Sequence, residues 1–373
     1  MKFKKILFIF GTRPEAIKMI PIYKQLKDNN SFDVKICLTA QHREMLDSVM
    51  SFFSVKPDFD LDIMQQNQTL ELLTSRLLLK VSEVLENVKP DLVCVHGDTT
   101  TSFISSLSAF YKQIDVAHIE AGLRTYNRYS PFPEEINRQL TSKIAKYHFA
   151  PTIIAKENLQ KENINEKNIF IVGNSVIDTL FLTINNIKVN YLEKEILNNI
   201  NYNFCNRKFI LITGHRRENF GEGFLDICIS IKNLAIKYKD IDFIYPVHLN
   251  PNVQKPVYDL LNNVDNIYLI EPLDYRDFVY IMSKCYLILT DSGGIQEEAP
   301  SLGKPVLVMR DNTERPEALD AGTVKLVGTK NIEQEVIKLV ENSCEYNKYK
   351  NLINPYGDGT TSEKITKILE EIL

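Results

Sequence analysis

The sequence has no apolar run long enough to cross a membrane, no export signal and no excess of basic charge. A membrane helix needs about 20 apolar residues, whereas the apolar runs here have the length of strands. The first run follows a basic start and ends after Phe10, too early for an export signal. With 44 Lys and Arg against 48 Asp and Glu, the net charge is −4, so no basic field favours a nucleic acid. We therefore expect a soluble, cytoplasmic protein with no membrane or nucleic-acid partner.

Paired cysteines and metal-ligand spacings are also missing. The cysteines lie far apart without a C-x-x-C pair, and no H-E-x-x-H motif or Cys/His cluster occurs. We expect the cysteines to be reduced and buried as small core residues, and we expect no bound metal. The cysteines are Cys37, Cys94, Cys205, Cys228, Cys285 and Cys344.

The two common glycine-rich nucleotide fingerprints are absent as well. No strand is followed by G-x-G-x-x-G, and no G-x-x-x-x-G-K-[ST] occurs anywhere in the chain. These absences argue against a tightly held NAD and against a P-loop ATPase. We therefore expect a protein without a cofactor.

What the sequence does contain is an alternation of short apolar strands with helix-length segments. The strands are continuous runs of Ile, Val, Leu and Phe, which is typical of parallel sheets covered on both faces. The alternation predicts an α/β fold with doubly wound, Rossmann-like sheets. The predicted strands are 5–10, 34–39, 92–96, 116–119, 147–150 and 169–172 in the first half, and 209–213, 243–246, 267–270, 287–290, 306–309 and 324–327 in the second.

The length of 373 residues exceeds what one hydrophobic core usually supports, which predicts two domains. We place the N-terminal domain at residues 1–184, a polar linker region at 185–206 and the C-terminal domain at 207–358. Residues 359–373 are predicted to form a helix that packs back on the N-terminal domain. The two Rossmann-like domains are expected to face each other across a cleft.

Acidic residues follow the predicted strands of the first half, where ligands bind in such sheets. Asp98 and Glu120 come just after strands, and Glu134 lies in a later loop. Three acids near one rim would suit proton transfer, because burial and pairing can separate carboxylate pKa values. Each acid singly also fits a helix cap or a surface ion pair, and Asp98, before a run of threonines, fits an N-cap.

In the second half, His215 follows a strand beside Arg216 and Arg217, which suits an anionic ligand. The turn Ser292-Gly-Gly294 opens a helix and is a candidate phosphate site, although a plain turn between strand and helix explains it equally well. Of the remaining histidines, His118 and His148 lie inside apolar runs and are expected in the core. The sequence does not decide the role of His96 or His248.

Ten motifs occur in one order from Phe10 to Gly359. They are GTRPEAIK (11–18), TAQHREM (39–45), VHGDTTT (95–101), HIEAGLR (118–124), SPFPEE (130–135), GHRREN (214–219), YPVHLNP (245–251), DSGGIQEE (291–298), ERPE (314–317) and NPYGDG (354–359). Together they resemble the non-hydrolysing UDP-N-acetylglucosamine 2-epimerases of bacteria. The resemblance implies the glycosyltransferase-B arrangement of two domains, a homodimer, and production of UDP-N-acetylmannosamine for surface polysaccharides.

The resemblance also implies roles for individual residues. The implied catalytic residues are Asp98, Glu120, Glu134 and His215. The implied contacts to the UDP-sugar are Arg13, Lys18, Phe278, Ser292, Gly293, Gly294, Glu298 and Arg315. Glu298 and its neighbour Glu297 follow the candidate phosphate turn by one helical turn, where a ribose diol would lie.

Some relatives bind a second UDP-N-acetylglucosamine as an activator, and this chain departs from their pattern. Gln41, His42 and His248 match that possible effector site, but Glu44 and Asn67 replace the Gln and Arg of those relatives. An ionised Glu44 can only accept hydrogen bonds, so we predict weak or absent activation.

The implied chemistry explains why acids are needed. The C2 hydrogen of the sugar is not next to a carbonyl, so its direct removal would give an unstabilised carbanion. Elimination of UDP to a 2-acetamidoglucal, followed by re-addition, avoids this and requires acid/base groups and a diphosphate clamp. The alternatives are a hydrolysing 2-epimerase that releases N-acetylmannosamine and UDP, a UDP-diacetamido-uronate 2-epimerase, a glycosyltransferase of the same plan, and a non-catalytic nucleotide-sugar sensor.

Overall fold

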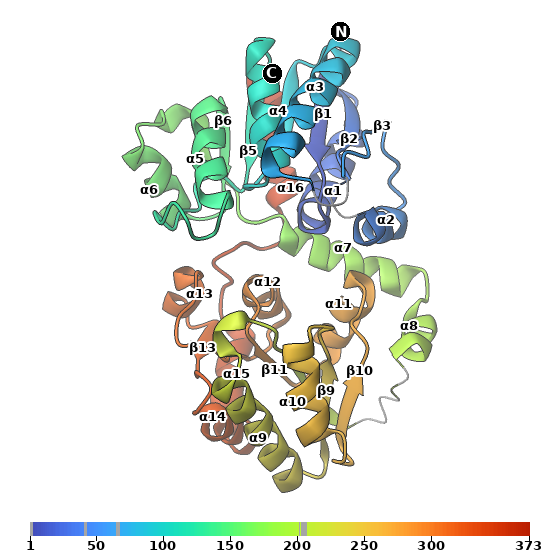
Figure 1. Cartoon of the computed structure of the whole chain (residues 1–373), viewed down its shortest axis with the longest axis vertical. Helices are drawn as coiled ribbons and strands as arrows, with labels where there is room; N and C mark the ends of the chain where they lie inside the picture. Colours follow the sequence, from blue (N-terminus) through green and yellow to red (C-terminus); the bar gives the residue numbers. More distant parts are fainter. Residues whose placement is uncertain (1–2, 41–42, 65–67, 201, 203–206) are drawn as a thin grey trace. The chain divides into compact units, whose positions relative to one another are not determined.

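The computed structural model describes residues 3–40, 43–64, 68–200, 202 and 207–373. The chain divides into two compact units (Figure 1). The first unit comprises Met1–Thr179 and Tyr356–Leu373, and the second comprises Leu180–Pro355. Among the described residues, no helix is long and apolar enough to cross a membrane.

The first unit is built on a parallel sheet whose strands lie in the order β3-β2-β1-β4-β5-β6-β7. Ile6 of the central strand β1 lies opposite Val34 of β2 on one side and Leu92 of β4 on the other. The strand order therefore reverses between β1 and β4, which is where ligands bind in doubly wound sheets. The strands are β1 Lys4–Phe10, β2 Phe32–Leu38, β3 Phe59–Asp60, β4 Leu92–His96, β5 Asp115–Ile119, β6 Tyr147–Ala150 and β7 Ile169–Ile171.

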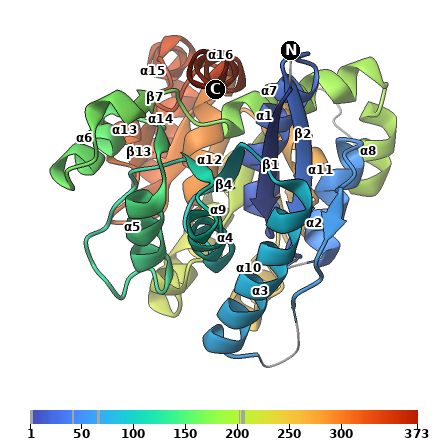
Figure 2. The same ribbon diagram turned by 90° about the horizontal axis from the view of Figure 1, so that it is seen from above.

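Helices cover both faces of this sheet, with α3, α4 and α5 on one face and α1 and α16 on the other (Figure 2). Leu7 and Ile9 of β1 pack with Val93 and Val95 of β4 and with Val81 of α3 in a fully buried core. The helices of this unit are α1 Arg13–Lys27, α2 Arg43–Phe52, α3 Leu70–Val88, α4 Thr100–Tyr111, α5 Glu134–Ile144, α6 Ile153–Lys161 and α16 Thr361–Ile372. Helix α7 Val176–Val189 begins in the first unit and continues into the second.

The second unit repeats the plan with a parallel sheet in the order β10-β9-β8-β11-β12-β13. The strands are β8 Lys208–Thr213, β9 Ile241–Pro246, β10 Ile267–Ile270, β11 Leu287–Thr290, β12 Val306–Val308 and β13 Val324–Leu326. The helices are α8 Glu193–Ile200, α9 Glu222–Lys237, α10 Pro251–Leu261, α11 Tyr275–Lys284, α12 Gly293–Glu298, α13 Pro316–Asp320, α14 Ile332–Glu341 and α15 Ser343–Lys348.

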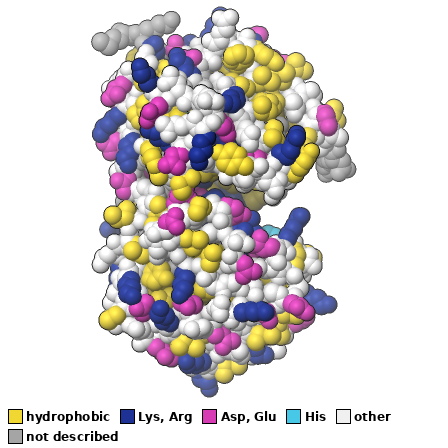
Figure 3. All heavy atoms as spheres, turned by 90° about the vertical axis from the view of Figure 1, so that its left-hand side faces the viewer, with side chains coloured by type: hydrophobic (Ala, Val, Ile, Leu, Met, Phe, Trp, Pro, Cys, Tyr) yellow, Lys and Arg dark blue, Asp and Glu magenta, His cyan; other side chains and the backbone are white. Residues whose placement is uncertain are grey.

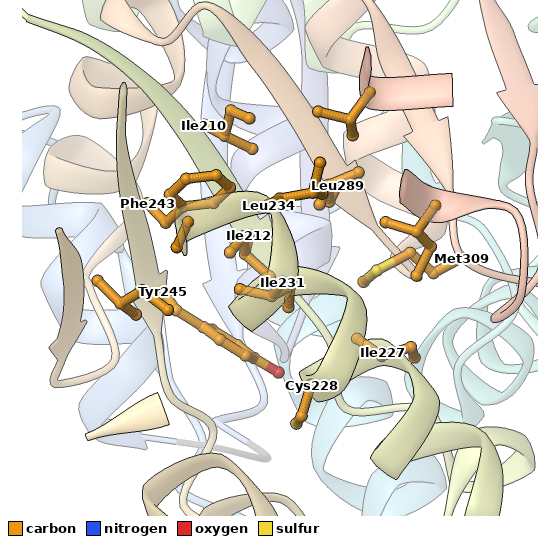
Figure 4. Packing of buried hydrophobic residues seen from close by; sticks show 14 of the residues in the cluster. Ile210, Ile212, Ile227, Cys228, Ile231, Leu234, Phe243, Tyr245, Leu289 and Met309 are labelled. Carbon is orange, nitrogen blue, oxygen red and sulfur yellow. The ribbon is translucent and has the colours of Figure 1, made fainter. Parts of the chain in front are cut away.

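The core of the second unit lies between its sheet and α9, where Ile212, Phe243 and Ile231 pack together (Figure 4). Tyr245 is the largest side chain in this core and is fully buried. Its hydroxyl group donates a 3.0 Å hydrogen bond to the main-chain oxygen of Gly214. The core thereby holds the loop after β8, which carries His215.

The predicted α/β fold with two Rossmann-like sheets is confirmed, and each predicted strand is present to within two residues. The two-residue strand β3 was not predicted, because it is too short to make an apolar pattern. Residues 185–200 of the predicted linker region contain the end of α7 and all of α8. Helix α16 packs against α1, and Asn29 donates a 2.7 Å hydrogen bond to the Glu370 carboxylate.

The cysteines largely follow the prediction, with one exception. Cys37, Cys94, Cys228 and Cys285 are free and buried, as predicted. Cys344 is free but exposed, because it lies in the short surface helix α15, so its predicted core position is wrong. Cys205 lies outside the described residues.

The two histidines predicted in the core are there. His118 and His148 are buried, and their Nε2 atoms lie 2.7 Å and 2.9 Å from the main-chain oxygens of Gly97 and Ser142. Burial is the main reason why the pKa of His118 falls to about 3. This histidine is therefore a neutral structural group at neutral pH.

Candidate active site

Glu120 lies just past β5 in the first unit and is held from several sides. Its Oε1 atom accepts hydrogen bonds from the Lys18 ammonium group and from Asn174 Nδ2, the latter at 2.9 Å. Its Oε2 atom lies 3.5 Å from His96 Nε2. The backbone of Glu120 is left-handed, with φ at +60°, a conformation that costs a non-glycine residue about 1 kcal/mol or more. The contacts around the carboxylate hold the residue in this conformation.

Asp98 follows β4 and pairs with Arg138 of α5. Burial raises the pKa of the Asp98 carboxyl group, the positive charge of Arg138 opposes the rise, and the charges of Glu120 and Glu134 add to it. The pKa of Asp98 therefore lies above its ordinary value. The three predicted acids form one electrostatic cluster at this edge of the sheet.

The interpretation of Asp98 as a helix cap is wrong. Thr99 caps α4, and its side chain accepts a 3.1 Å hydrogen bond from the Ser102 backbone N–H group. The Asp98 side chain is 28% exposed and turns to Arg138 instead. Its main-chain oxygen accepts a 3.0 Å hydrogen bond from Asn137 Nδ2, which fixes the loop against α5.

The adjacent acids Glu134 and Glu135 at the start of α5 have different surroundings. Glu135 is fully buried and accepts hydrogen bonds from the backbone N–H groups of Thr125 and Tyr126 at 3.0 Å and 3.1 Å. Burial alone would raise the pKa of Glu135, but the hydrogen bonds outweigh it and lower the pKa. Glu135 thus anchors the loop in its ionised form, while Glu134 is only half-buried.

Glu15 is a buried acid that the sequence interpretation missed. It accepts hydrogen bonds from the backbone N–H groups of Gly11 and Thr12 at 3.0 Å and 2.8 Å, and from the Thr99 hydroxyl group at 2.8 Å. Burial is the main reason why the pKa of Glu15 is raised. The residue ties the loop after β1 to the start of α4. Thr12 and Glu15 form a capping box, which was the available sequence signal.

The two predicted basic residues of α1 have different partners. Lys18 contacts Glu120, and its side chain is 14% exposed. The side chain of Arg13, in the first turn of α1, is half-buried and makes no hydrogen bond or ion pair with any residue that the structure describes. Arg13 is therefore the basic group available to an anion at this end of the helix.

In the second unit, Asp291 organises the loop that carries His215. One oxygen of its fully buried carboxylate accepts 2.7 Å hydrogen bonds from the backbone N–H groups of His215 and Arg216. The other oxygen lies 3.5 Å from His215 Nδ1. The His248 ring stacks on the His215 ring at 5.2 Å between centroids.

The electrostatic surroundings of His215 favour a neutral ring. Burial lowers the pKa of His215, the charge of Asp291 opposes this, and the charges of His248 and Arg216 lower the pKa further. The resulting pKa lies below the ordinary value. At neutral pH, the imidazole can therefore accept a proton or a hydrogen bond.

The predicted phosphate turn begins the short helix α12, and Ser292 is the N-cap residue of this helix. A Cβ atom added to Gly293 would lie 3.6 Å from Arg315 Nη2 and 3.9 Å from Arg216 Nη2. Arg315 Nε donates a 2.5 Å hydrogen bond to the buried Glu297 carboxylate. Two guanidinium groups therefore lie beside this turn, which gives it the positive charge that a diphosphate needs.

The two carboxylates of α12 point to different partners. Glu297 pairs with Arg315, so its side chain supports the turn. Glu298 Oε2 accepts a 2.9 Å hydrogen bond from the Tyr275 hydroxyl group at the start of α11. Phe278 lies three residues after Tyr275 and is half-buried. Because residues three apart share a helix face, Phe278 lies on the side of α11 that meets Glu298.

A buried arginine that the sequence interpretation also missed joins two loops of the second unit. Arg310 follows β12 and makes ion pairs with Glu218 and, at 2.7 Å, with Glu314. The hydrogen bond from Arg310 is the largest cause that lowers the pKa of Glu314, to about 2. The loops that carry Arg216 and Arg315 are linked through this network.

Only part of the possible effector site can be located. Gln41, His42 and Asn67 lie outside the described residues, as does the side chain of Glu44. His248 is exposed, and its Nδ1 atom accepts a 3.1 Å hydrogen bond from the Asn250 backbone N–H group.

Comparison with known proteins gives consistent matches over nearly the whole chain. Residues 24–370 match the family described as UDP-N-acetylglucosamine 2-epimerase. The UDP-N-acetylglucosamine 2-epimerase of Campylobacter jejuni is 56% identical over 372 residues, covering 98% of this chain and 97% of that protein.

Solved structures agree with this match. The crystal structure of UDP-GlcNAc 2-epimerase from Neisseria meningitidis bound to UDP-GlcNAc has a TM-score of 0.89 and 54% identity, and covers 98% of this chain and 100% of that one. The Methanocaldococcus jannaschii UDP-GlcNAc 2-epimerase in complex with UDP-GlcNAc and UDP has a TM-score of 0.77 and 38% identity, and covers 98% and 99%.

Proposed function

Since the chain belongs to the UDP-N-acetylglucosamine 2-epimerase family, we propose that it interconverts UDP-N-acetylglucosamine and UDP-N-acetylmannosamine without hydrolysis. The isomerase class follows from the family. The route that we propose is elimination of UDP and its re-addition. The observation that carries this route is the acidic cluster of the first unit, in which Asp98 and Glu120 have different electrostatic surroundings.

The proposed route has two steps, elimination and re-addition. A carboxylate takes the C2 proton, the C1–O bond to the diphosphate breaks, and its electron pair leaves with UDP while a C1–C2 double bond forms. UDP then adds back to C1 while an acid delivers a proton to the opposite face of C2. This needs two groups whose protonation states differ at the same pH.

The surroundings of the two acids support different roles. The Lys18 ammonium group stabilises the ionised carboxylate of Glu120. We therefore assign to Glu120 the role of the base that removes the C2 proton in one direction of the reaction. The pKa of Asp98 is raised, so we assign the proton donor to Asp98. In the reverse direction, the two acids exchange roles.

Groups in the second unit support binding of the departing diphosphate. The guanidinium groups of Arg216 and Arg315 lie beside Gly293, where they can stabilise the negative charge that develops on the leaving group. His215 lies on the loop beside Arg216 and has a lowered pKa, so we propose that it binds the diphosphate as a neutral hydrogen-bonding group. We also propose that Arg13 of the first unit, whose side chain is half-buried, contacts the UDP-sugar.

The test of this function is incubation of the purified protein with UDP-N-acetylglucosamine alone, with no acceptor sugar, NAD or metal. Phosphorus NMR should show a mixture of the two UDP-sugars, and the same mixture should form from pure UDP-N-acetylmannosamine. Accumulation of UDP with free N-acetylmannosamine would show a hydrolysing epimerase instead. Lack of turnover without an acceptor would favour a glycosyltransferase, and turnover only of a diacetamido uronate would change the substrate.

We also propose that the protein forms a homodimer through α3 and α4 of the first unit. The ion pair between Lys112 and Glu86 places the ends of these helices side by side. Leu79, Phe110 and Tyr111 on them are 66%, 60% and 66% exposed. Figure 3 shows apolar side chains gathered on one part of the first unit. Such a patch suits contact with a second copy of the same surface.

Light scattering after size exclusion tests the dimer. The wild-type protein should have the mass of two chains, and Phe110→Glu should have the mass of one, because a charge at the contact must be desolvated. Tyr191→Glu is the matched control, since Tyr191 is 88% exposed and lies on neither helix. A monomeric wild type, or a dimeric Phe110→Glu, would contradict this interface.

The state of the cysteines supports a cytoplasmic location. The described cysteines are all free, and four of them are buried. Free thiols of this kind are typical of proteins in reducing compartments. We therefore propose that the reaction takes place in the cytoplasm.

A further inference from the structure

Asn174 lies between β7 and α7 and joins three parts of the first unit. Its side chain donates a 2.9 Å hydrogen bond from Nδ2 to Glu120 Oε1. Its backbone N–H group donates a 2.6 Å hydrogen bond to the main-chain oxygen of Tyr356. Its Oδ1 atom accepts a 3.1 Å hydrogen bond from the Val176 backbone N–H group, which begins α7. The residue is buried, its hydrogen bond with the Val176 N–H group is buried, and its hydrogen bond to Glu120 is partly buried.

The residues that follow Asn174 hold the turn of α1 that carries Lys18. Ser175 Oγ donates a 2.6 Å hydrogen bond to the main-chain oxygen of Lys18, and Thr179 Oγ1 donates one to that of Ile17. Pro21 lies inside α1 and has no N–H group to donate to Ile17. The start of α7 therefore supplies donors at the point where the proline interrupts the helix.

The position of this segment is further fixed by the C-terminal part of the chain. Gly173 has φ at +93°, and a Cβ atom there would lie 2.8 Å from Thr361 Oγ1. Asp178 accepts hydrogen bonds from the backbone N–H groups of Thr361 and Ser362 at 3.2 Å and 2.7 Å. Residues 173–179 are thus packed against the residues that follow Tyr356, where the chain returns to the first unit.

We propose that Asn174 is a positioning residue for epimerisation, which aims the Glu120 carboxylate at the substrate. This inference rests on the proposed role of Glu120. Asn174 and Lys18 donate to the same oxygen of Glu120, Oε1. Together they set the plane of the carboxylate and the direction in which Oε2 faces. Because Ser175 and Thr179 hold the backbone of α1, the same segment places both donors.

Two substitutions of Asn174 distinguish the loss of its hydrogen bond to Glu120 from the effect of a negative charge placed beside Glu120. Asn174→Ser keeps a small acceptor that can cap α7 but cannot reach Glu120. Asn174→Asp keeps the shape and the Oδ1 acceptor, removes the donor, and places a second carboxylate beside Glu120. The matched control is Asn165→Asp, because Asn165 Oδ1 accepts the same kind of local hydrogen bond, from the Lys167 backbone N–H group at 3.1 Å.

Both Asn174 variants should lower kcat about 10- to 100-fold, the range expected for a lost hydrogen bond to a charged group. The KM for UDP-N-acetylglucosamine should change less than about threefold, because binding of the nucleotide is assigned mainly to the other unit. Asn174→Asp should also move the pH profile of kcat to higher pH, because a neighbouring carboxylate disfavours ionisation of Glu120. Asn174→Ser, which loses the donor but adds no charge, should move it less than Asn174→Asp does, and Asn165→Asp should match the wild type.

The outcomes distinguish this proposal from the proposed function. An inactive wild-type protein would overturn the function itself. An active wild type, an inactive Glu120→Gln and a fully active Asn174→Ser would keep the function and overturn the positioning role. If the pH profile of kcat for Asn174→Asp coincided with that of the wild type, the positioning role would also be overturned. The position of the pH profile does not depend on the fraction of folded protein. Thermal melting of each variant shows whether a lower kcat comes from unfolding.

Discussion

Pro21 interrupts α1 at the turn that carries Lys18, and the Thr179 hydroxyl group of α7 donates to the carbonyl group that the proline leaves without its helix donor. Substitutions at Thr179 and at Pro21 test this support of α1 by α7. In Thr179→Val, the side chain keeps its shape but loses the hydroxyl group that donates to the Ile17 main-chain oxygen. Thr179 is fully buried and Ile17 nearly so. A buried carbonyl group left without a donor costs about 1–3 kcal/mol. We expect the free energy of unfolding of the first unit to fall by that amount.

Pro21→Ala should rescue this loss. Alanine supplies the N–H group that proline lacks, so in the Thr179→Val background Ile17 regains a donor from within its own helix. The double-mutant cycle should therefore give a favourable coupling of about 1–2 kcal/mol between the two positions. Urea unfolding, followed by circular dichroism and by loss of activity, measures it for all four proteins.

The result that would refute this reasoning is additivity. If the two substitutions add to within about 0.5 kcal/mol, the Thr179 hydroxyl group does not compensate for the proline. A Thr179→Val protein as stable as the wild type would contradict it as well. Ser230→Ala in α9 is a control, because Ser230 is buried in the other unit and should show no coupling to Pro21.

Three further predictions concern the acids and regulation. Asp98→Asn should keep the fold and lower turnover about 10²- to 10⁴-fold, as measured by NMR of the UDP-sugars, and a fully active variant would leave Asp98 without a catalytic role. The pKa of Glu314 is lowered to about 2, below its ordinary value of 4.5 in an unfolded chain. Ionised Glu314 therefore stabilises the fold above pH 4.5 and loses this effect as the pH falls toward 2. The stability advantage of the wild type over Glu314→Gln, taken from urea midpoints, should shrink over that range, and a constant advantage would contradict the ion pair with Arg310. Because we predict weak or absent activation, the plot of initial rate against UDP-N-acetylglucosamine concentration should be close to hyperbolic, and the reverse reaction should start without a lag. A sigmoidal plot would show a working effector site.

Most of the fold could be predicted because parallel strands covered on both faces leave continuous apolar runs in the sequence. Because ligands bind at the carboxyl ends of such strands, the predicted strands that became β4 and β5 also indicated the edge where Asp98 and Glu120 lie. The strand β3 Phe59–Asp60 could not be predicted, because two residues make no pattern. Its place in the sheet depends on pairing with Cys37 and Leu38 of β2.

The candidate site was less predictable, because side-chain partners depend on contacts between distant segments. Nothing in the adjacent pair Glu134 and Glu135 indicates which acid is buried, and the loop at Thr125 and Tyr126 decides it. The contact between Lys18 and Glu120 joins residues 102 positions apart. In contrast, the Glu15 capping box is local, and its spacing from Thr12 could have revealed it.

The measurement that tests the central claim most directly is proton NMR of the product formed in D2O. The account predicts that UDP-N-acetylmannosamine made from UDP-N-acetylglucosamine carries deuterium at C2, and that recovered UDP-N-acetylglucosamine gains deuterium there as the reaction approaches equilibrium. The proton removed by a carboxylate exchanges with solvent before one is returned to the opposite face. Product that retains protium at C2, or turnover that requires added NAD, would contradict elimination and re-addition by the acids of the first unit.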